Sequence, residues 1–277
     1  MNILITGANG FIGNNLIELL SKNKNFNLFK GTRSTIDLYS KDNIEKYLDY
    51  NNIDAIIHCA IEGGSRLKVD DDGIFYKNLL MYENLNTFNF RYKCFINLAS
   101  GAEFDRSCEI FDIKEEEISN RVPHDYYGLS KNIISKSLLN KNNSLNLRIF
   151  GCFYYNELDT RFIKNNIKRY INKKPMIIHQ DKFMDFIYLE DISHIINYYL
   201  SNNIKLSSDI NMSYIKKYKL SDIANIINNL SNHKVDINIE CNDISLNYCG
   251  NGLKLNSLNL NLKGIELGIK ECYNKMI

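Results

Sequence analysis

The sequence has no tryptophan and only two prolines, and neither sign of charge predominates. Its 34 lysines and arginines are balanced by 32 aspartates and glutamates, which gives a net charge of +2. This balance offers no electrostatic case for a nucleic-acid or acidic-membrane partner. No apolar run approaches the roughly 18–20 residues that a membrane-spanning helix needs. The first expected strand begins at Asn2, which leaves no room for a signal peptide. We therefore expect a cytoplasmic protein without a nucleic-acid or membrane partner.

Paired cysteines are also missing. The seven cysteines are scattered, odd in number and never spaced as C-x-x-C, so we expect neither a disulfide framework nor a thiolate zinc site. The five histidines show no metal-ligand spacing, and we expect no metal. The 277 residues, 44% of them hydrophobic and 24% charged, are enough for one large α/β domain, or for a core domain with a smaller one attached.

Short apolar runs alternate with amphipathic segments along the first part of the chain. We expect strands at 2–6, 27–31, 55–59, 94–98 and 145–150, and helices at 14–20, 42–50, 77–90 and 127–139. This alternation predicts an α/β fold, a Rossmann-like doubly wound parallel sheet. Beyond residue 150 the pattern weakens to a helix at 159–172, a short strand at 184–189 and a helix at 191–200. We expect 1–150 to bind a dinucleotide and also to receive 184–201, and 151–277 to form mainly a smaller substrate-binding portion.

A glycine-rich turn lies between the first expected strand and the first helix. The run Gly7-Ala8-Asn9-Gly10-Phe11-Ile12-Gly13 fits G-x-x-G-x-x-G. In such a turn the first glycine permits the tight bend, the second lets the backbone approach a pyrophosphate, and the third lets helix and strand pack closely. The N–H groups at the start of the helix then face the anion. We therefore expect Gly7, Asn9, Gly10, Phe11, Ile12 and Gly13 to bind a nicotinamide dinucleotide.

The end of the second expected strand bears on the choice between NADP and NAD. An acidic residue there would bind the ribose 2′-hydroxyl of NAD, but the segment Lys30-Gly31-Thr32-Arg33-Ser34 has none. Arg33 can instead make a bidentate contact with the 2′-phosphate of NADP. The alternative is a solvated arginine at a strand end. The sequence favours NADP(H) and leaves NAD(H) open.

Tyr127 and Lys131 are four residues apart in an expected helix and so share one helix face. We expect the Lys131 ammonium to lower the pKa of the Tyr127 phenol and to hold the nicotinamide ribose. Such a phenol can exchange a proton with a carbinol oxygen. Ser100 follows the fourth expected strand, at the sheet edge where ligands bind, and its hydroxyl can bond the substrate oxygen. Taken alone, Tyr127 could be a surface residue and Ser100 a helix cap.

These features together resemble the extended short-chain dehydrogenases/reductases of the NAD-dependent epimerase/dehydratase family, which modify nucleotide sugars. GDP-fucose synthase and other 4-keto-sugar reductases are similar members. The residues that carry the resemblance are Gly7, Gly10, Gly13, Asp37, Leu38, His58, Cys59, Ala60, Asn78, Ser100, Tyr127, Lys131, Arg148 and 185–191.

The resemblance implies roles for several of these residues. Asp37 and Leu38 would border the adenine, while Cys59 and Ala60 would line the cofactor. Ser100, Tyr127 and Lys131 would be the catalytic triad. The C-terminal portion would bind a nucleoside-diphosphate sugar, and two copies would form a homodimer.

Departures from the family pattern narrow the chemistry. Sugar 4,6-dehydratases have Asp and Glu after the catalytic Ser/Thr, where this chain has Gly101 and Ala102. The cysteine and histidine that relatives similar to GDP-fucose synthase use at C3 and C5 correspond to Ala102 and Asn156. None of these side chains is a competent acid or base at neutral pH. The resemblance places Ser100, Gly101 and Ala102 along the substrate. With dehydration and proton exchange at C3 and C5 excluded, the family reaction that is left is redox chemistry at C4.

Other departures concern the substrate. The family's pyrophosphate-binding Arg corresponds to Met184, and its Asn after Arg148 corresponds to Gly151. Arg161 or Lys182 could replace the lost charge, or each could be a solvated surface residue. His124 and Asp125 could line the substrate pocket, although Asp125 could instead cap a helix.

The residues, together with what the resemblance implies, predict an NAD(P)-dependent oxidoreductase. We expect it to reduce the C4 keto group of a nucleoside-diphosphate 4-keto-(6-deoxy) sugar with NADPH, without C3 or C5 epimerisation, in surface-polysaccharide sugar biosynthesis. One alternative is a nucleotide-sugar 4-epimerase that holds NAD tightly. A non-catalytic, cofactor-sensing relative is a third possibility, which the complete triad disfavours.

Overall fold

The computed structural model describes residues 1–64, 70–139, 141–202, 207–243 and 245–277, and the chain folds into two compact units. The first unit comprises Met1–Ser107, Glu115–Arg148 and Ser193–Ile210. The second comprises Cys108–Lys114, Ile149–Ile192 and Asn211–Ile277. The segment that returns to the first unit is therefore Ser193–Ile210, whereas the sequence predicts 184–201 for it.

A six-stranded sheet forms the centre of the first unit. Its strands are β1 (Asn2–Thr6), β2 (Asn27–Gly31), β3 (Ala55–His58), β4 (Cys94–Ser100), β6 (Ser144–Ile149) and β10 (Ser207–Asn211), in the order β10-β6-β4-β3-β1-β2. β1 pairs in parallel with β2 and β3, and β3 with β4. β3, β4 and β6 are buried along their whole length, as a doubly covered parallel sheet requires.

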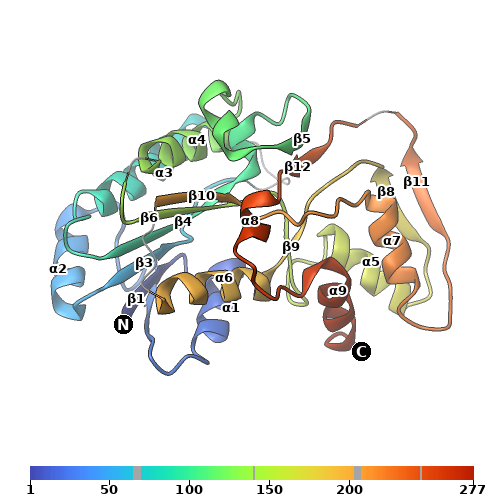
Figure 1. Ribbon diagram of the computed structural model, residues 1–277, viewed down its shortest axis with the longest axis horizontal. Coiled ribbons are helices and arrows are strands. Elements are labelled where there is room, and N and C mark those ends of the chain that lie inside the picture. The colour runs from blue at the N-terminus through green and yellow to red at the C-terminus, as the bar shows by residue number, and fades with distance from the viewer. Residues whose placement is uncertain (65–69, 140, 203–206, 244) are drawn as a thin grey trace. The chain divides into compact units, whose positions relative to one another are not determined.

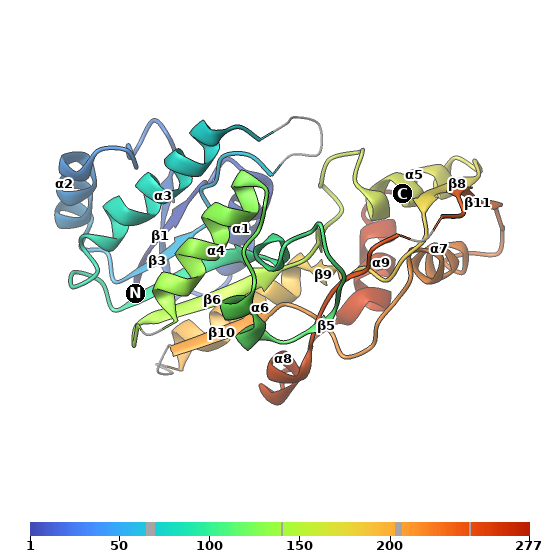
Figure 2. The same cartoon turned by 90° about the horizontal axis from the view of Figure 1, so that it is seen from above.

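Helices cover both faces of this sheet. They are α1 (Phe11–Leu20), α2 (Lys41–Asn51), α3 (Asp72–Asn86), α4 (Tyr126–Leu138) and α6 (Leu189–Ser201). Figures 1 and 2 show α3 and α4 on one face, and α1 with α6 on the other. One core cluster joins the strand residues Leu4, Ile56 and Phe95 to apolar side chains of α2, α3 and α4. The Rossmann-like fold predicted from the alternating pattern is confirmed.

The described residues of the second unit form three two-stranded parallel sheets. They pair β8 (Met176–Gln180) with β11 (Ile237–Cys241), β5 (Ile110–Ile113) with β12 (Tyr248–Gly250), and β7 (Cys152–Phe153) with β9 (Ile187–Tyr188). Its helices are α5 (Phe162–Ile171), α7 (Leu220–Asn228), α8 (Leu253–Ser257) and α9 (Gly264–Asn274). Buried residues of α5, α7 and α9, among them Ile167, Ile223 and Ile269, give this unit its own apolar interior.

Most differences between the observed helices and the ranges predicted from the sequence occur at the helix N-termini. α2, α3 and α4 each begin after a residue whose side chain accepts a hydrogen bond from the first turn, namely Ser40, Asp71 and Asp125. The Asp71 cap starts α3 at Asp72, five residues before the predicted start at 77. α1 begins at Phe11 and so contains the last glycine of the turn. β9 keeps only two of the six residues predicted for a strand at 184–189.

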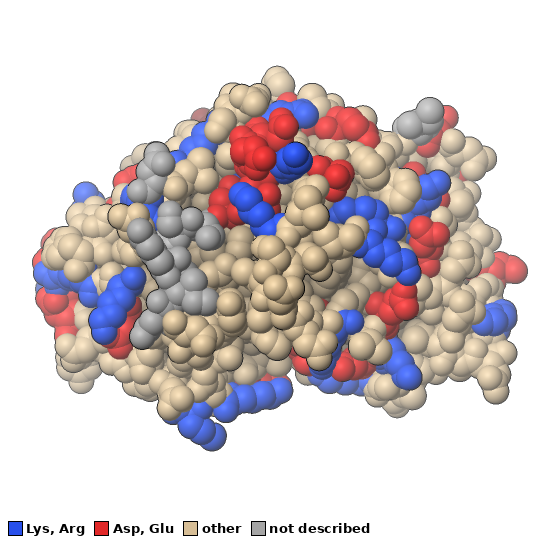
Figure 3. Space-filling view, viewed as in Figure 1, with Lys and Arg blue, Asp and Glu red and all other residues tan. Residues whose placement is uncertain are grey.

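Charged side chains of both signs lie on the face of the molecule in view in Figure 3. Lysines and arginines lie there among aspartates and glutamates, with uncharged regions between them. Among the described residues, no helix combines the length and apolar character needed to cross a bilayer. The same residues contain no group of His, Cys, Asp and Glu arranged to hold a metal ion.

Candidate active site

The glycine-rich turn lies at the carboxyl edge of the parallel sheet. Gly7 has φ +64, and a Cβ there would lie 2.7 Å from the Ala60 nitrogen. A Cβ on Gly13 would lie 2.4 Å from the Gly7 carbonyl oxygen. No side chain caps the N-terminus of α1, and its first turn carries no acidic residue. A backbone cradle that only glycine permits, at an uncapped helix N-terminus, fits a dinucleotide pyrophosphate.

Arg33, expected at the cofactor 2′-phosphate, lies two residues beyond β2 and already has an acidic partner. Its Nη2 is 2.5 Å from Glu62 Oε1, and 87% of its side chain is exposed. Tyr39 Oη also donates to Glu62 Oε1, at 3.3 Å. No sequence pattern indicates this pairing, because 29 residues separate Arg33 from Glu62. The basic group is present where NADP would need it, but a carboxylate lies beside it.

Asp37 and Leu38, predicted to border the adenine, lie in the loop between β2 and α2. Asp37 Oδ1 accepts a hydrogen bond from the Tyr39 N–H, and the Leu38 carbonyl accepts one from Asn84 Nδ2 at 3.0 Å. Leu38 is buried. These bonds fix the loop that follows the second strand.

Cys59 and Ala60, predicted to line the cofactor, follow β3 and lie against the glycine-rich turn. Both donate their N–H groups to Thr6 Oγ1, at 3.2 Å. Thr6 Oγ1 lies 2.9 Å from His58 Nδ1. Burial raises the pKa of the Cys59 thiol to about 12, so the thiol is neutral at physiological pH. Cys59 therefore presents an uncharged side chain next to the glycine-rich turn.

Ser100, Tyr127 and Lys131 are brought together, as the triad prediction requires. Ser100 ends β4 and its side chain is hydrogen-bonded to Tyr127. Lys131 is buried, and its Nζ donates to the Leu98 carbonyl at 2.6 Å. Gly128, between Tyr127 and Lys131, lets the helix lie close to the backbone that follows Ser100. A Cβ at this position would lie 2.7 Å from the Ala102 carbonyl oxygen.

The pKa of Tyr127 differs from the sequence-based expectation. Its pKa is raised, chiefly because the surrounding protein excludes water, and the negative charges of Glu103 and Asp125 add to that shift. The hydrogen bond with Ser100 and the charge of Arg106 oppose it. The expected net lowering does not occur, and Lys131 is not among the largest influences on this pKa. Burial lowers the pKa of Lys131 itself to about 8. The Lys131 ammonium therefore begins to lose its proton just above neutral pH.

Two residues beside Tyr127 were missed from the sequence. The guanidinium of Arg106 lies 5.8 Å from the centroid of the Tyr127 ring and donates to Asp125 Oδ1 at 2.8 Å. Gly64 has φ +70, and a Cβ there would lie 2.7 Å from the ring of Tyr127. The adjacent pair Gly63-Gly64 was the only sequence signal for this contact. Arg106 had none, because it follows a 3₁₀ turn rather than a recognisable motif.

Gly101 and Ala102 lie in the 3₁₀ helix η1 (Gly101–Phe104) directly after Ser100, and both are buried. Ala102 donates its N–H to Ser100 Oγ at 3.2 Å. Asp125 caps α4, which is the structural role considered for it. His124 is 82% exposed, with its Nδ1 2.9 Å from Asp105 Oδ2. The two positions after Ser100 therefore offer the site no acid or base.

The substrate residues predicted in the second unit are engaged with neighbours. Arg161 Nε lies 3.7 Å from Glu157 Oε2. Glu157 is buried, and burial raises the pKa of its carboxyl to about 8. Met184, at the position of the family's arginine, is buried, and its backbone forms a parallel β-bridge with Tyr248. The carbonyl of Lys182 accepts a hydrogen bond from the Leu220 N–H at 3.0 Å.

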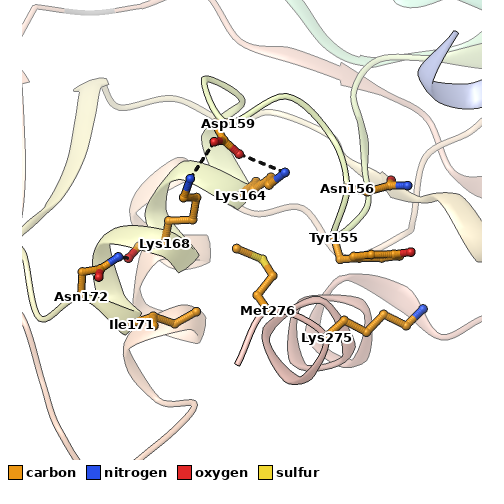
Figure 4. A pocket seen from close by; sticks show the side chains of 9 residues that line it. All are labelled: Tyr155, Asn156, Asp159, Lys164, Lys168, Ile171, Asn172, Lys275 and Met276. Atoms are coloured by element: carbon orange, nitrogen blue, oxygen red, sulfur yellow. Dashed lines mark hydrogen bonds and ion pairs between the residues drawn. The ribbon is translucent and has the colours of Figure 1, made fainter.

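A cavity of about 410 Å³ lies within the second unit. Figure 4 shows the side chains around it: Tyr155, Asn156, Asp159, Lys164, Lys168, Ile171, Asn172, Lys275 and Met276. Asp159 pairs with Lys164 at 3.0 Å and with Lys168 at 2.6 Å. Three lysines against one aspartate leave the lining net positive, which suits an anionic group.

The geometry of the first unit agrees with what sequence comparison shows. The profile of the NAD dependent epimerase/dehydratase family matches residues 3–213. The chain belongs to this family. The expected NAD(P)-dependent oxidoreductase is thereby confirmed.

Two curated relatives and one solved structure illustrate the similarity. GDP-L-colitose synthase of Yersinia pseudotuberculosis is 25% identical over 258 residues, which cover 84% of this chain and 83% of the relative. GDP-6-deoxy-D-talose 4-dehydrogenase of Aggregatibacter actinomycetemcomitans is 26% identical over 250 residues, covering 86% and 82%. The structure of GDP-mannoheptose C4 reductase from Campylobacter jejuni with NADP bound has a TM-score of 0.81 at 18% identity, covering 99% and 98%.

Proposed function

We propose that this protein uses NADPH to reduce the C4 keto group of a nucleoside-diphosphate 4-keto-(6-deoxy) sugar, without proton exchange at C3 or C5. The observation that carries the proposal is the Ser100–Tyr127–Lys131 cluster followed by Gly101 and Ala102. The cluster can polarise and protonate a carbonyl oxygen. The two positions after Ser100 cannot move a ring proton.

The chain's own residues account for the proton and for the developing charge. A bound dihydronicotinamide would supply the hydride. Tyr127 would donate its phenolic proton to the C4 oxygen as that oxygen gains negative charge. Ser100 would hydrogen-bond the same oxygen and orient it. Lys131, fixed by the Leu98 carbonyl, would hold the nicotinamide ribose.

The relatives support this proposal by what their names state. One is a 4-dehydrogenase of a GDP-6-deoxy sugar, and a structural neighbour is a C4 reductase with NADP bound. Arg33 supports NADP, the cofactor usually consumed in reductive biosynthesis. We further propose that the second unit contacts the nucleotide sugar. A homodimer stays a prediction, which light scattering of the purified protein would check.

The test combines the protein with NADPH and a panel of 4-keto-6-deoxy sugars linked to GDP, CDP, dTDP or UDP, in deuterated water. We expect one NADPH to disappear per product molecule, with no enzyme-dependent deuterium at C3 or C5. The control is Tyr127→Phe, which keeps the ring but lacks the proton.

Two results would overturn the proposal. Catalytic deuterium incorporation at C3 or C5 would show that another side chain moves ring protons. Interconversion of 4-hydroxyl epimers with no net NADPH use would establish a 4-epimerase instead.

A further inference from the structure

A buried ionic network lies directly behind Ser100. Glu103 in η1 and Arg148 in β6 are both completely buried, and Arg148 Nε donates to Glu103 Oε2 at 2.8 Å. Arg148 Nη2 donates to Asp209 Oδ2 at 2.9 Å. The guanidinium also lies 4.8 Å from the centroid of the Phe104 ring. A buried carboxylate is costly unless it is paired, and Arg148 provides that pairing.

The second carboxylate oxygen of Glu103 accepts hydrogen bonds from Ser100 and from the helix that carries Tyr127 and Lys131. Glu103 Oε1 accepts the backbone N–H of Ser100 at 3.0 Å and the hydroxyl of Ser135 at 2.9 Å. The Glu103 carbonyl accepts Asn132 Nδ2 at 2.9 Å. Ser135 and Asn132 belong to α4, the helix that carries Tyr127 and Lys131. One residue therefore ties the end of β4 to the helix of the other two triad members.

Glu103 also affects the charges of the triad. Its carboxylate is the main influence that opposes the lowering of the Lys131 pKa by burial, and it adds to the raised pKa of Tyr127. The groups that face Tyr127 are Glu103, Asp125 and Arg106. Those that interact electrostatically with Lys131 are Glu103, Cys59 and His58.

We propose that Glu103, anchored by Arg148, is a positioning residue for catalysis, because it fixes Ser100 relative to the α4 helix that carries Tyr127 and Lys131. The proposal rests on the proposed function for its turnover assay. It predicts that disturbing one oxygen of a side chain that touches neither substrate nor cofactor lowers turnover.

The change Glu103→Gln tests this sharply, since a glutamine offers one acceptor oxygen where the glutamate offers two. The buried guanidinium of Arg148 needs that oxygen. The amide NH₂ must then face the Ser100 N–H and the Ser135 hydroxyl, so Ser100 loses its acceptor.

Asp209→Asn is the matched control. It removes one negative charge from the same guanidinium, at a similar distance and depth of burial. The asparagine oxygen can keep the Arg148 bond. The Ser100 N–H keeps its acceptor, because that acceptor is Glu103 Oε1. The control therefore removes one negative charge beside Arg148 but leaves the hydrogen bond of the Ser100 N–H in place.

We expect Glu103→Gln to lower kcat about 100-fold, the loss typical of a reacting group displaced by about 1 Å. The NADPH Kd should stay within about twofold, because the glycine-rich turn is untouched. The alkaline limb of the kcat–pH profile should move to lower pH, since the lost negative charge lowers the pKa values of Tyr127 and Lys131. Asp209→Asn should lower the melting temperature comparably and keep kcat within about threefold.

Equal losses of kcat in the two variants, or wild-type kcat in Glu103→Gln, would overturn the proposal. If Glu103→Gln does not fold, Glu103→Asp keeps the charge but shortens the side chain, and it should show the same loss of kcat. If neither variant folds while Asp209→Asn does, Glu103 serves folding and the positioning role is refuted.

Hydrogen exchange of the peptide that contains the Ser100 amide separates this proposal from the proposed function. We expect faster exchange at Ser100 in Glu103→Gln than in Asp209→Asn, and this needs no substrate. If the wild-type protein oxidises NADPH with none of the sugars, the proposed function fails, and the exchange result still decides the role of Glu103. Unchanged exchange would refute it.

Discussion

Replacing Arg33 by alanine should remove most of the preference for NADPH over NADH. The residues around the end of β2 include no acid that would bind a ribose 2′-hydroxyl, and Arg33 is the arginine of this segment. A charge-assisted contact with a phosphate contributes about 1.5–3 kcal/mol. Because the Arg33 side chain is 87% exposed and paired with Glu62, we expect the lower end, about 1.5 kcal/mol, which is about tenfold in Kd.

Glu62 gives the same reasoning a second perturbation of opposite sign. Its carboxylate repels a phosphate placed beside Arg33, and two unit charges about 4 Å apart in water interact by about 1 kcal/mol. Glu62→Gln should therefore tighten NADPH binding about fivefold. The NADH affinity should stay unchanged, since NADH carries no 2′-phosphate.

The assay is the Kd of NADPH and of NADH, measured by calorimetry for the wild type and for each variant. Lys30→Ala is the control, because it removes an exposed cation within β2 that no predicted phosphate contact uses. Equal NADPH and NADH affinities in the wild type would refute the reasoning, and so would an unchanged preference in Arg33→Ala. Weaker NADPH binding in Glu62→Gln would show that Glu62 helps to hold the cofactor.

Four further substitutions test other parts of the structure. Tyr127→Phe should abolish most turnover and leave the NADPH Kd near normal, whereas Lys131→Met should harm both; wild-type turnover in the first would show that the acid is misassigned. Gly64→Ala should lower kcat about 100-fold, because its Cβ would displace the Tyr127 ring; an unaffected kcat would mean that the loop yields instead. The folded-state pKa of Glu157 is about 8 against an ordinary 4.5, so its contribution to stability is present at low pH and is lost as the pH rises from 4.5 through 8. Glu157→Gln should thus shrink the fall in melting temperature between pH 5 and pH 8, and an unchanged fall would refute the raised pKa.

The features that could be predicted from the sequence are those set by local patterns. β1, the glycine-rich turn and α1 are contiguous, and their roles depend on spacing alone. Tyr127 and Lys131 share a helix face because four residues separate them. Ser100 could be placed beside them because the carboxyl ends of parallel strands meet at one edge of the sheet.

The features that could not be predicted depend on residues far apart in the chain. Arg148 lies 45 residues after Glu103 and 61 residues before Asp209, and no spacing rule links them. The pairing of Arg33 with Glu62 joins the ends of two different strands in the same way. The predicted direction of the Tyr127 pKa shift was wrong for a related reason. Its sign depends on how burial, a hydrogen bond and several charges balance, and the sequence shows only Lys131.

The raised pKa of Tyr127 bears on the direction of the reaction. A reductase must begin its proton step with a protonated phenol, whereas a 4-epimerase must first use the same group as a base to oxidise the C4 hydroxyl. Burial, Glu103 and Asp125 favour the protonated phenol, and Arg106 and Ser100 only partly oppose them. Near neutral pH the Tyr127 phenol therefore holds the proton that a C4 alkoxide needs. The surroundings of this one side chain thus fit the proton donor that the proposed reduction requires, whereas Gly101 and Ala102 bear only on proton exchange at C3 and C5.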